Sequence, residues 1–298
     1  MKHILKRATS LMLVVAMILS LAPAAFAAGE DTGVTYYVAN SNSNGSDING
    51  DGTQGNPYMT IGNAIAKAKE AGKTAVTINL LSDIGASLEL KFDDPIPVTI
   101  QSSDGATHMI QYTGTSPIGS ESGFIKATGS ADLTFKNVKL AGSTGAYDGR
   151  VLYAADGAVV KLKDVTVTAG RMNNPVNNQG GAGIFAAANG TINVSGTSTI
   201  TGNETSGNGG GIYVADKGTV TLSDGVTVTN NTADNFGGGI AATTQSSDIG
   251  GLTMTGNVTV TANTATRGGS GMYVEQNAKA VVSGAVKVFD NKNGTDQS

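Results

Sequence analysis

The last third of the chain repeats one sequence pattern four times. Each copy opens with a glycine-rich segment that leads into an apolar residue, and an asparagine follows 19 to 23 residues later. The apolar residues stand 28, 28 and 32 residues apart, and they are Ile184, Ile212, Ile240 and Met272. The asparagines are Asn203, Asn231, Asn263 and Asn291. A period of this length is typical of a solenoid, in which each coil buries its apolar face against its neighbours.

Apolar and polar residues alternate within each repeat. In the second copy the alternation covers three short segments, at residues 212–214, 220–222 and 226–228. A period of two predicts strands, and the turns between them are short, so each strand must pair with the equivalent strand of the next coil. The sequence therefore predicts an all-β protein, a parallel β-helix solenoid of roughly eight coils. Helical and leucine-rich repeats are disfavoured because no repeat contains a segment with helical periodicity.

A secretory signal peptide is predicted at residues 1–27. Three basic residues precede an apolar run at residues 11–19, and small residues at 25 and 27 provide a cleavage pattern. An uncleaved membrane anchor is the alternative, but the run is short for a membrane-spanning helix. We therefore expect a secreted protein, extracellular or at the cell surface, with no membrane span after cleavage.

The mature chain is acidic and lacks cysteine. Removal of the signal peptide leaves 16 basic and 23 acidic residues, a net charge of −7. This charge disfavours nucleic acid and anionic lipid as partners, because both would be repelled. The absence of cysteine excludes disulfides and thiol chemistry.

Residues 28–73 are predicted to form a strand, a polar loop and a capping helix. The strand covers Val34–Val38, and the helix begins after Thr60 as N-cap and ends at Gly72. Such a helix would cover the open end of the first coil. The coils then occupy residues 74–298. The sequence ends seven residues after Asn291 without a second cap, so we expect it to be truncated at the C-terminus.

The amino-terminal segment carries a family resemblance. A Tyr-Tyr-Val strand, a loop rich in Asn, Gly and Asp, and the segment Pro57–Ile65 resemble the cap of right-handed parallel β-helix proteins of the pectate-lyase-like group. The later repeats, with Asn-Asn-Thr-Ala before Gly-Gly-Gly-Ile, resemble those of polymorphic outer membrane proteins and bacterial surface β-helices. The Phe-x-x-Asn half of that pattern is absent, since Phe289 stands only two residues before Asn291. The resemblance implies a right-handed coil; it specifies activity poorly.

A possible Ca²⁺ site lies in the amino-terminal loop. Asp47, Asn49 and Asp51, followed by Gly52, match the first half of a calcium-binding loop, in which alternate residues supply oxygen ligands. The position expected for a bidentate Glu is occupied by Tyr58. The alternative is a turn in which these side chains bond to the loop backbone. No other cofactor is indicated.

Aromatic residues follow the apolar residue that anchors several coils. Alternation places them on the outer face of one sheet, where stacked rings could bind a glycan or a protein. Stacking between coils would also stabilise the sheet without any ligand. These candidate binding residues are Tyr153, Phe185, Tyr213 and Tyr273, and Ala241 interrupts the row.

The repeated asparagines and threonines allow structural and functional interpretations. The four asparagines are expected to stack their amides along the solenoid and to adopt the left-handed turn conformation. Thr-x-Thr pairs at residues 166–168, 199–201, 227–229 and 259–261 should form a regular outward array. The array resembles ice-binding β-solenoids, although threonine is also a favoured residue on exposed strands.

No catalytic residues are predicted. Lyases of this fold use clustered acids and an Arg or Lys base, and the charged neighbourhood of Arg150 and Arg171 is where the sequence offers that chemistry. We expect a bacterial surface repeat domain that acts as an adhesin-like stalk or as a scaffold for an extracellular glycan or surface protein. The alternative is a polysaccharide lyase or glycoside hydrolase.

Overall fold

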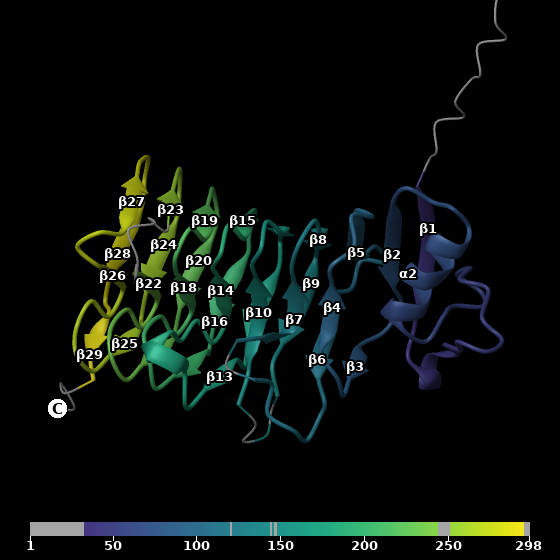
Figure 1. Ribbon diagram of the computed structural model, residues 1–298, viewed down its shortest axis with the longest axis horizontal. Helices are drawn as coiled ribbons and strands as arrows, with labels where there is room; N and C mark the ends of the chain where they lie inside the picture. Colours follow the sequence, from purple (N-terminus) through teal and green to yellow (C-terminus); the bar gives the residue numbers. More distant parts are fainter. Residues whose placement is uncertain (1–32, 120, 144, 146–147, 244–250, 295–298) are drawn as a thin grey trace, which may run out of the picture. The chain divides into compact units, whose positions relative to one another are not determined.

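The computed structural model describes residues 33–294, except residues 120, 144, 146–147 and 244–250. The predicted signal peptide, and most of the insert in the third repeat, lie outside the described residues. From Val34 onward the chain forms one compact unit. Its described strands form four sheets that extend along a row of stacked coils (Figure 1).

Two long sheets make up most of the coil walls. The nine-stranded sheet consists of β1 (Val34–Val38), β2 (Val76–Leu80), β5 (Val98–Ser102), β8 (Asp132–Lys136), β11 (Val159–Lys163), β15 (Thr191–Ser195), β19 (Thr219–Leu222), β23 (Gly251–Met254) and β27 (Lys279–Val282). The eight-stranded sheet consists of β3 (Ile84–Ala86), β6 (His108–Tyr112), β9 (Val138–Ala141), β12 (Thr166–Thr168), β16 (Thr199–Thr201), β20 (Thr227–Thr229), β24 (Thr259–Thr261) and β28 (Lys287–Phe289).

Two further sheets complete the coils. The seven-stranded sheet consists of β4 (Leu90–Phe92), β7 (Gly123–Ala127), β10 (Arg150–Ala154), β14 (Ile184–Ala186), β18 (Ile212–Val214), β22 (Ile240–Ala242) and β26 (Met272–Val274). The five-stranded sheet consists of the short strands β13 (Arg171–Met172), β17 (Glu204–Thr205), β21 (Thr232–Ala233), β25 (Thr264–Ala265) and β29 (Lys292–Asn293). Each strand pairs in parallel with the equivalent strand of the next coil. The described residues make about seven full turns, which confirms the predicted solenoid.

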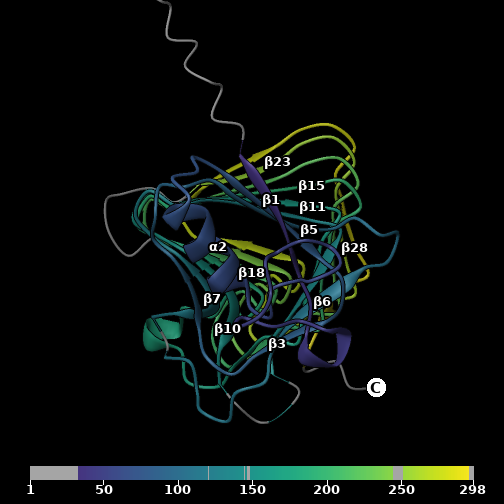
Figure 2. The same ribbon diagram turned by 90° about the vertical axis from the view of Figure 1, so that its right-hand side faces the viewer.

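A helix lies at the amino-terminal end of the coils. Helix α2 (Ile61–Glu70) begins where the Thr60 hydroxyl accepts a hydrogen bond from the backbone N–H of Asn63, and Gly72 adopts a positive φ after its last turn. Its buried residues, Ile61, Ala64 and Ala68, belong to the same apolar core as the strands. Figure 2 shows α2 across this end of the stack, beside β1. The loop between them contains a short 3₁₀ helix, η1 (Ser41–Ser43).

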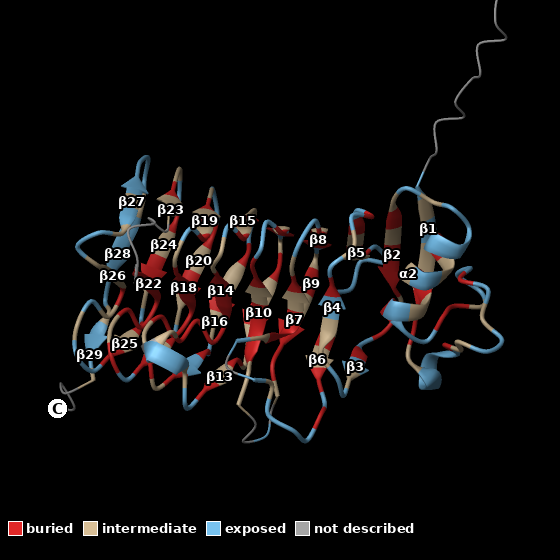
Figure 3. Ribbon diagram, in the orientation of Figure 1, coloured by how far each residue is buried: buried red, intermediate tan, exposed pale blue. Residues whose placement is uncertain are grey.

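The core is one continuous apolar column inside the coils. Alternate residues of each strand are fully buried there, for example Ile192, Val220 and Leu252 at one level of the nine-stranded sheet. Figure 3 shows this buried column ending at the last described coil, which is coloured as exposed. Val288 is 47% exposed, whereas its partner Val260 in the preceding coil is fully buried. Among the described residues no helix is long and apolar enough to cross a membrane.

The asparagines form a continuous hydrogen-bonded ladder. The amide nitrogen of Asn203 donates to the side-chain oxygen of Asn231 at 2.9 Å, and the contact recurs from Asn231 to Asn263 and from Asn263 to Asn291 at 3.0 Å. Each amide group also donates to main-chain carbonyl groups inside the coil. The ladder confirms the stacking that the sequence predicts. Because the amides face inward and satisfy one another, burying them costs little.

The predicted backbone conformation of these asparagines is wrong by one residue. The left-handed conformation occurs at the residue before each ladder asparagine, with φ of 64°, 54°, 55° and 51° at Gly202, Asn230, Ala262 and Asp290. The turn is completed there, so the following asparagine is free to direct its amide into the coil.

The glycine-rich segments fit around this ladder, as the third repeat shows. Gly237 has φ of 68°, a conformation that glycine adopts without strain. A Cβ on Gly238 would lie 2.1 Å from the carbonyl oxygen of Thr264, and one on Gly239 would lie 2.9 Å from the Asn263 amide nitrogen. Glycine is therefore repeated because the chain turns sharply and then passes against the next coil.

The threonine pairs align as predicted. In the eight-stranded sheet Thr166, Thr199, Thr227 and Thr259 occupy one level, and Thr168, Thr201, Thr229 and Thr261 occupy the other. All eight are partly exposed. The residues between them are fully buried and form part of the core.

Candidate functional site

Three of the predicted aromatic residues form a stacked column. Strands β10, β14 and β18 place Tyr153, Phe185 and Tyr213 in register on the seven-stranded sheet. Their ring centroids are 5.3 Å and 5.4 Å apart, and the ring planes are within 6° of parallel. The repeat of the coils thus produces the ring-on-ring stacking that the sequence suggests.

Most of this column is covered. Phe185 is 3% exposed and Tyr213 is 1% exposed, so the expectation that their rings stand on an open outer surface is wrong. They lie outside the main core, in a separate apolar cluster with Ala215 and Ala241. The Tyr213 hydroxyl is hydrogen-bonded to Thr243, and burial raises the pKa of Tyr213 to about 12. Only Tyr153, at the amino-terminal end of the column, is partly exposed.

Tyr273 belongs to a different pair. Its ring stacks on Phe236, with centroids 4.6 Å apart, and Ala241 separates this pair from the column. Sequence reasoning missed Phe236 because it precedes the glycines of its repeat rather than following the anchoring apolar residue. The structure therefore divides the four candidate binding residues between two places.

A buried arginine lies beside the column. The Arg150 guanidinium is 4.2 Å from the centre of the Phe185 ring, and the residue is 1% exposed. It donates hydrogen bonds to the main-chain carbonyl oxygens of Gln179 and Gly180, and to that of Ser122 at 3.4 Å. Burial lowers the pKa of Arg150 to about 10, which leaves it charged at neutral pH. Arg150 thus connects the loops that precede β7 and β14.

A hollow of about 430 Å³ opens next to Tyr153. Its walls come from β7, β10, β14 and the loop that contains the short 3₁₀ helix η2 (Val176–Asn178), which is the teal helix that protrudes from the coils in Figure 2. The Lys126 ammonium lies 5.5 Å from the centre of the Tyr153 ring. The residues that line it are Glu121, Lys126, Tyr153, Asp156, Val176, Asn177, Gln179, Phe185 and Ala187.

Two more hollows occur on the preceding coils. One, of about 490 Å³, lies between the segment at residues 87–89 and the loop at residues 112–119, and reaches Ser122. The other, of about 240 Å³, lies between the start of α2 and residues 84–90, and shares the lining residues 87–89. Ser122 of the second hollow is adjacent in sequence to Glu121 of the first, and residues 87–89 line both of the others, so the three hollows are neighbours on successive coils.

Two acidic residues influence Tyr153. Burial is the main reason that the pKa of Tyr153 is raised, and the negative charges of Asp156 and Glu121 contribute to the rise. Sequence reasoning missed Glu121 and Lys126. Lys126 could have been found, because it follows Ile125 just as Tyr153 follows Leu152 in the next coil. No repeated pattern marks Glu121.

The charged side chains around Arg150 and Arg171 in the sequence have different partners in the structure. Arg171 lies on the five-stranded sheet, 3.3 Å from the carboxylate of Glu204. Lys161 lies on the nine-stranded sheet and forms an ion pair with Asp132 at 2.7 Å. The backbone of Arg171 pairs with Gly149, next to Arg150, but the Arg150 guanidinium is buried beneath Phe185 and bonds to the carbonyl oxygens of Gln179 and Gly180. These residues therefore do not form one catalytic cluster.

The predicted calcium ligands bond to their own loop. Asp47 accepts hydrogen bonds from the backbone N–H groups of Met59 and Thr60, at 2.8 Å and 3.0 Å, and so holds the loop against the start of α2. Asp51 accepts bonds from the Thr53 hydroxyl and backbone, which lower the pKa of Asp51. The observed contacts are those of the alternative turn interpretation. Calcium binding by Asp47, Asn49 and Asp51 stays a prediction.

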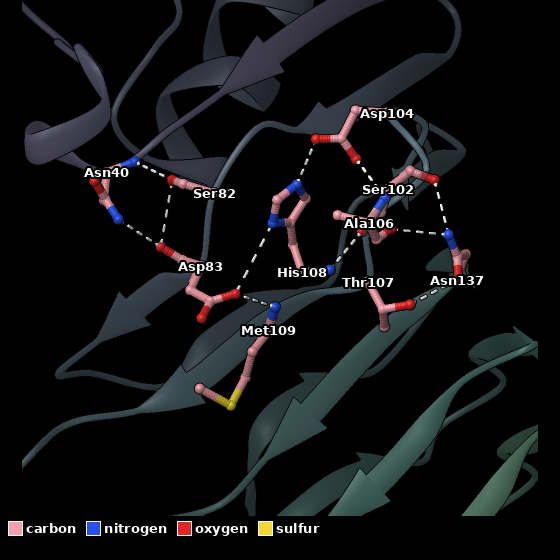
Figure 4. A network of polar contacts seen from close by, with 10 residues as sticks. All are labelled: Asn40, Ser82, Asp83, Ser102, Asp104, Ala106, Thr107, His108, Met109 and Asn137. Atoms are coloured by element: carbon pink, nitrogen blue, oxygen red, sulfur yellow. Dashed lines mark hydrogen bonds and ion pairs between the residues drawn. The ribbon is translucent and has the colours of Figure 1, made fainter.

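His108 is the centre of a polar network at the amino-terminal coils. Its Nε2 lies 2.8 Å from the Asp104 carboxylate, and its Nδ1 lies 3.9 Å from Asp83 (Figure 4). The Ser102 hydroxyl accepts a bond from the His108 backbone N–H, so this serine does not face the ring as a nucleophile would. The arrangement joins neighbouring turns of the chain.

Comparison with known proteins identifies the family. The model of the right-handed β-helix region matches residues 122–297, more than half of the chain. The chain belongs to the right-handed β-helix family. The coils of this β-helix are therefore right-handed, as the resemblance of the amino-terminal cap implied.

The other comparisons leave activity open. No curated protein matches this β-helix significantly. Among solved structures, the crystal structure of the GH136 lacto-N-biosidase from Eubacterium ramulus, a selenomethionine derivative, is similar over 87% of this chain and 68% of that chain. The sequence identity is 11% and the TM-score is 0.24. A similarity this weak carries no argument about what this β-helix does.

Proposed function

We propose that this β-helix is a secreted bacterial surface domain that binds an extended extracellular glycan in the series of hollows beside Tyr153. The observation that carries the proposal is the partly exposed Tyr153 ring in a hollow that has two further hollows on the preceding coils. Coils repeat about every 4.8 Å, so a linear chain laid along them would contact several coils at once. Sugar C–H groups contact aromatic rings favourably, and they would do so here at the part of the Tyr153 ring that Phe185 and Lys126 leave open.

The rigid coil stack supports this role. The rings behind Tyr153 are buried and stacked, and Arg150 fixes the loops on either side. A side chain held in this way loses little conformational entropy when a ligand binds. The predicted signal peptide at residues 1–27 supports secretion, and the acidic charge makes nucleic acid an unsuitable partner.

A change at Tyr153 tests the proposal. Binding would first be surveyed on a glycan array and then measured by calorimetry with the glycan that gives the strongest signal. We expect Tyr153→Leu to weaken that binding about tenfold, because the ring that packs on the sugar is lost. The control is Phe289→Leu, which removes an aromatic ring that is 47% exposed on the last described coil, outside the hollows. Equal effects of the two changes, or no binding to any glycan, would refute the proposal.

A carbohydrate-active enzyme is the second candidate. It is favoured by the two carboxylates, Glu121 and Asp156, that line the hollow around Tyr153. Glycoside hydrolases use a pair of carboxylates on either side of the scissile bond. New reducing ends from the bound glycan would indicate a hydrolase, and unsaturated products would indicate a lyase. Binding without either product would favour the adhesin-like role.

A further inference from the structure

The charges that line the hollows are mostly negative. In the hollow beside Tyr153, Glu121 and Asp156 are exposed acids, and Lys126 is the basic side chain among the lining residues. Lys126 lies over the Tyr153 ring, so part of its charge is directed at the ring face. A ligand in this hollow would meet more negative than positive charge.

The preceding hollows share one charged lining residue, an acid that has a basic neighbour. Glu89 is the charged side chain among the residues that line both of them. Its carboxylate accepts a hydrogen bond from the Ser122 hydroxyl, and the Lys91 ammonium lies 3.4 Å away on the other side. The Lys91 ammonium offsets the charge of Glu89, so the negative bias that a glycan meets comes mainly from Glu121 and Asp156 beside Tyr153.

The nearby arginine does not reverse this bias. Arg150 directs guanidinium N–H groups at the carbonyl oxygens of Gln179, Gly180 and Ser122, and it is 1% exposed beneath Phe185. Its donors are therefore occupied within the protein. A sugar carboxylate in the hollow would find no arginine fork to bind.

From these charges we infer that the site selects neutral or amino sugars and discriminates against uronic acids. The inference rests on the proposed glycan-binding function and specifies its ligand class. A uronate chain carries a negative charge on every sugar, and those beside Tyr153 would approach Glu121 and Asp156. Like charges a few ångströms apart repel strongly in a partly desolvated groove, so the acids act as a barrier to the wrong ligand.

Pairs of ligands that share a backbone and differ in charge test the inference. Oligogalacturonate and its fully methyl-esterified form share one backbone, and chitin and chitosan oligomers provide a second pair, neutral and cationic. Dissociation constants would be measured for all four at low salt. We expect the ester to bind at least about tenfold more tightly than the free acid, and chitosan to bind at least as tightly as chitin. Added salt should reduce both differences, because it screens charge.

A double variant tests whether Glu121 and Asp156 cause the discrimination against uronic acids. In Glu121→Gln/Asp156→Asn the lining near Tyr153 keeps its shape and carries only the Lys126 charge. We expect the ratio of ester to acid affinity to fall about tenfold. The matched control is Asp234→Asn, an exposed acid after β21 that does not line the hollows. An unchanged melting temperature would confirm that both variants fold.

The outcomes separate the two proposals. If none of the four oligomers binds and the glycan array is also blank, the glycan-binding proposal fails and the inference fails with it. If oligogalacturonate binds as tightly as its ester or more tightly, the inference is overturned and glycan binding stands. An affinity ratio that changes equally in the double variant and in Asp234→Asn would also overturn it.

Discussion

The coils joined by the asparagine ladder and the coils that precede them are built in different ways. From Asn203 to Asn291 each coil repeats the last, and uncharged amides and close-packed glycines join neighbours. Before Gly190 the connections vary in length, and charged side chains such as Asp83, His108 and Arg150 join one turn of chain to another. The three hollows are all lined by residues between Thr60 and Ala187.

The difference shows how a repeat protein acquires a site. Strict repetition places each polar group beside the same group of the next coil. This arrangement is stable, but it leaves few hollows that a ligand could recognise. Loops of unequal length break this symmetry and leave spaces between them. The irregular half must then hold its loops with individual contacts, and Arg150 is one of them.

The largest expected effect comes from breaking the ladder at its middle. Asn231→Ala removes the amide that donates to Asn263 and to the carbonyl groups of Ile200 and Thr229, and that accepts from Asn203. Several buried groups then lose their partners, so we expect the free energy of unfolding to fall by about 3 kcal/mol. Chemical denaturation would measure it. Asn193→Ala, a partly exposed asparagine on β15, should change it by less than about 0.5 kcal/mol. Similar losses in the two variants would show that the ladder does not stabilise the coils.

A smaller effect is expected from adding one methyl group to a glycine. Gly239→Ala places a Cβ 2.5 Å from the Gly271 carbonyl oxygen and 2.9 Å from the Asn263 amide. The neighbouring coil must shift, and we expect a loss of about 2 kcal/mol. Gly62→Ala, in helix α2 with no atom within 4 Å of the new Cβ, should instead gain about 0.5 kcal/mol. The changes in the free energy of unfolding, measured by denaturation, should have opposite signs if Gly239 is required for close packing between coils. Two changes of the same sign would contradict this explanation.

The smallest effect concerns acid sensitivity of the irregular coils. The hydrogen bond with His108 is the main reason that the pKa of Asp104 is lowered. The ionised form is favoured in the folded protein, so its contribution is fully present above the ordinary pKa of an aspartate, near 3.8, and is lost as the pH falls through the lower folded value. The gap in melting temperature between the native protein and Asp104→Asn should be small at pH 6 and shrink below pH 4. If the difference in melting temperature did not depend on pH, the ionised Asp104 carboxylate bonded to His108 would not be its cause.

Much of the fold was predictable from local pattern. The alternation around Ile212 predicted parallel strands, the spacing of the asparagines predicted their stacking, and Thr60 and Gly72 marked the ends of α2. Each of these features depends on residues at a fixed distance in sequence, and the repeat brings equivalent residues together. The candidate site was harder to predict. Tyr153 was identified, but Glu121 and Phe236 lie outside the repeated positions, and the turn residue before each ladder asparagine was misplaced by one.

The sequence by itself determined which residues face into the coils and which face out, because a strand alternates and a coil repeats. Only the tertiary structure decided which outward residues meet solvent. Phe185 and Tyr213 face outward from the core, yet they are covered, and Tyr153 in the same row is partly open. Exposure depends on side chains that arrive from other coils, such as Arg150 against Phe185 and Thr243 against Tyr213, and no local period records where they will lie.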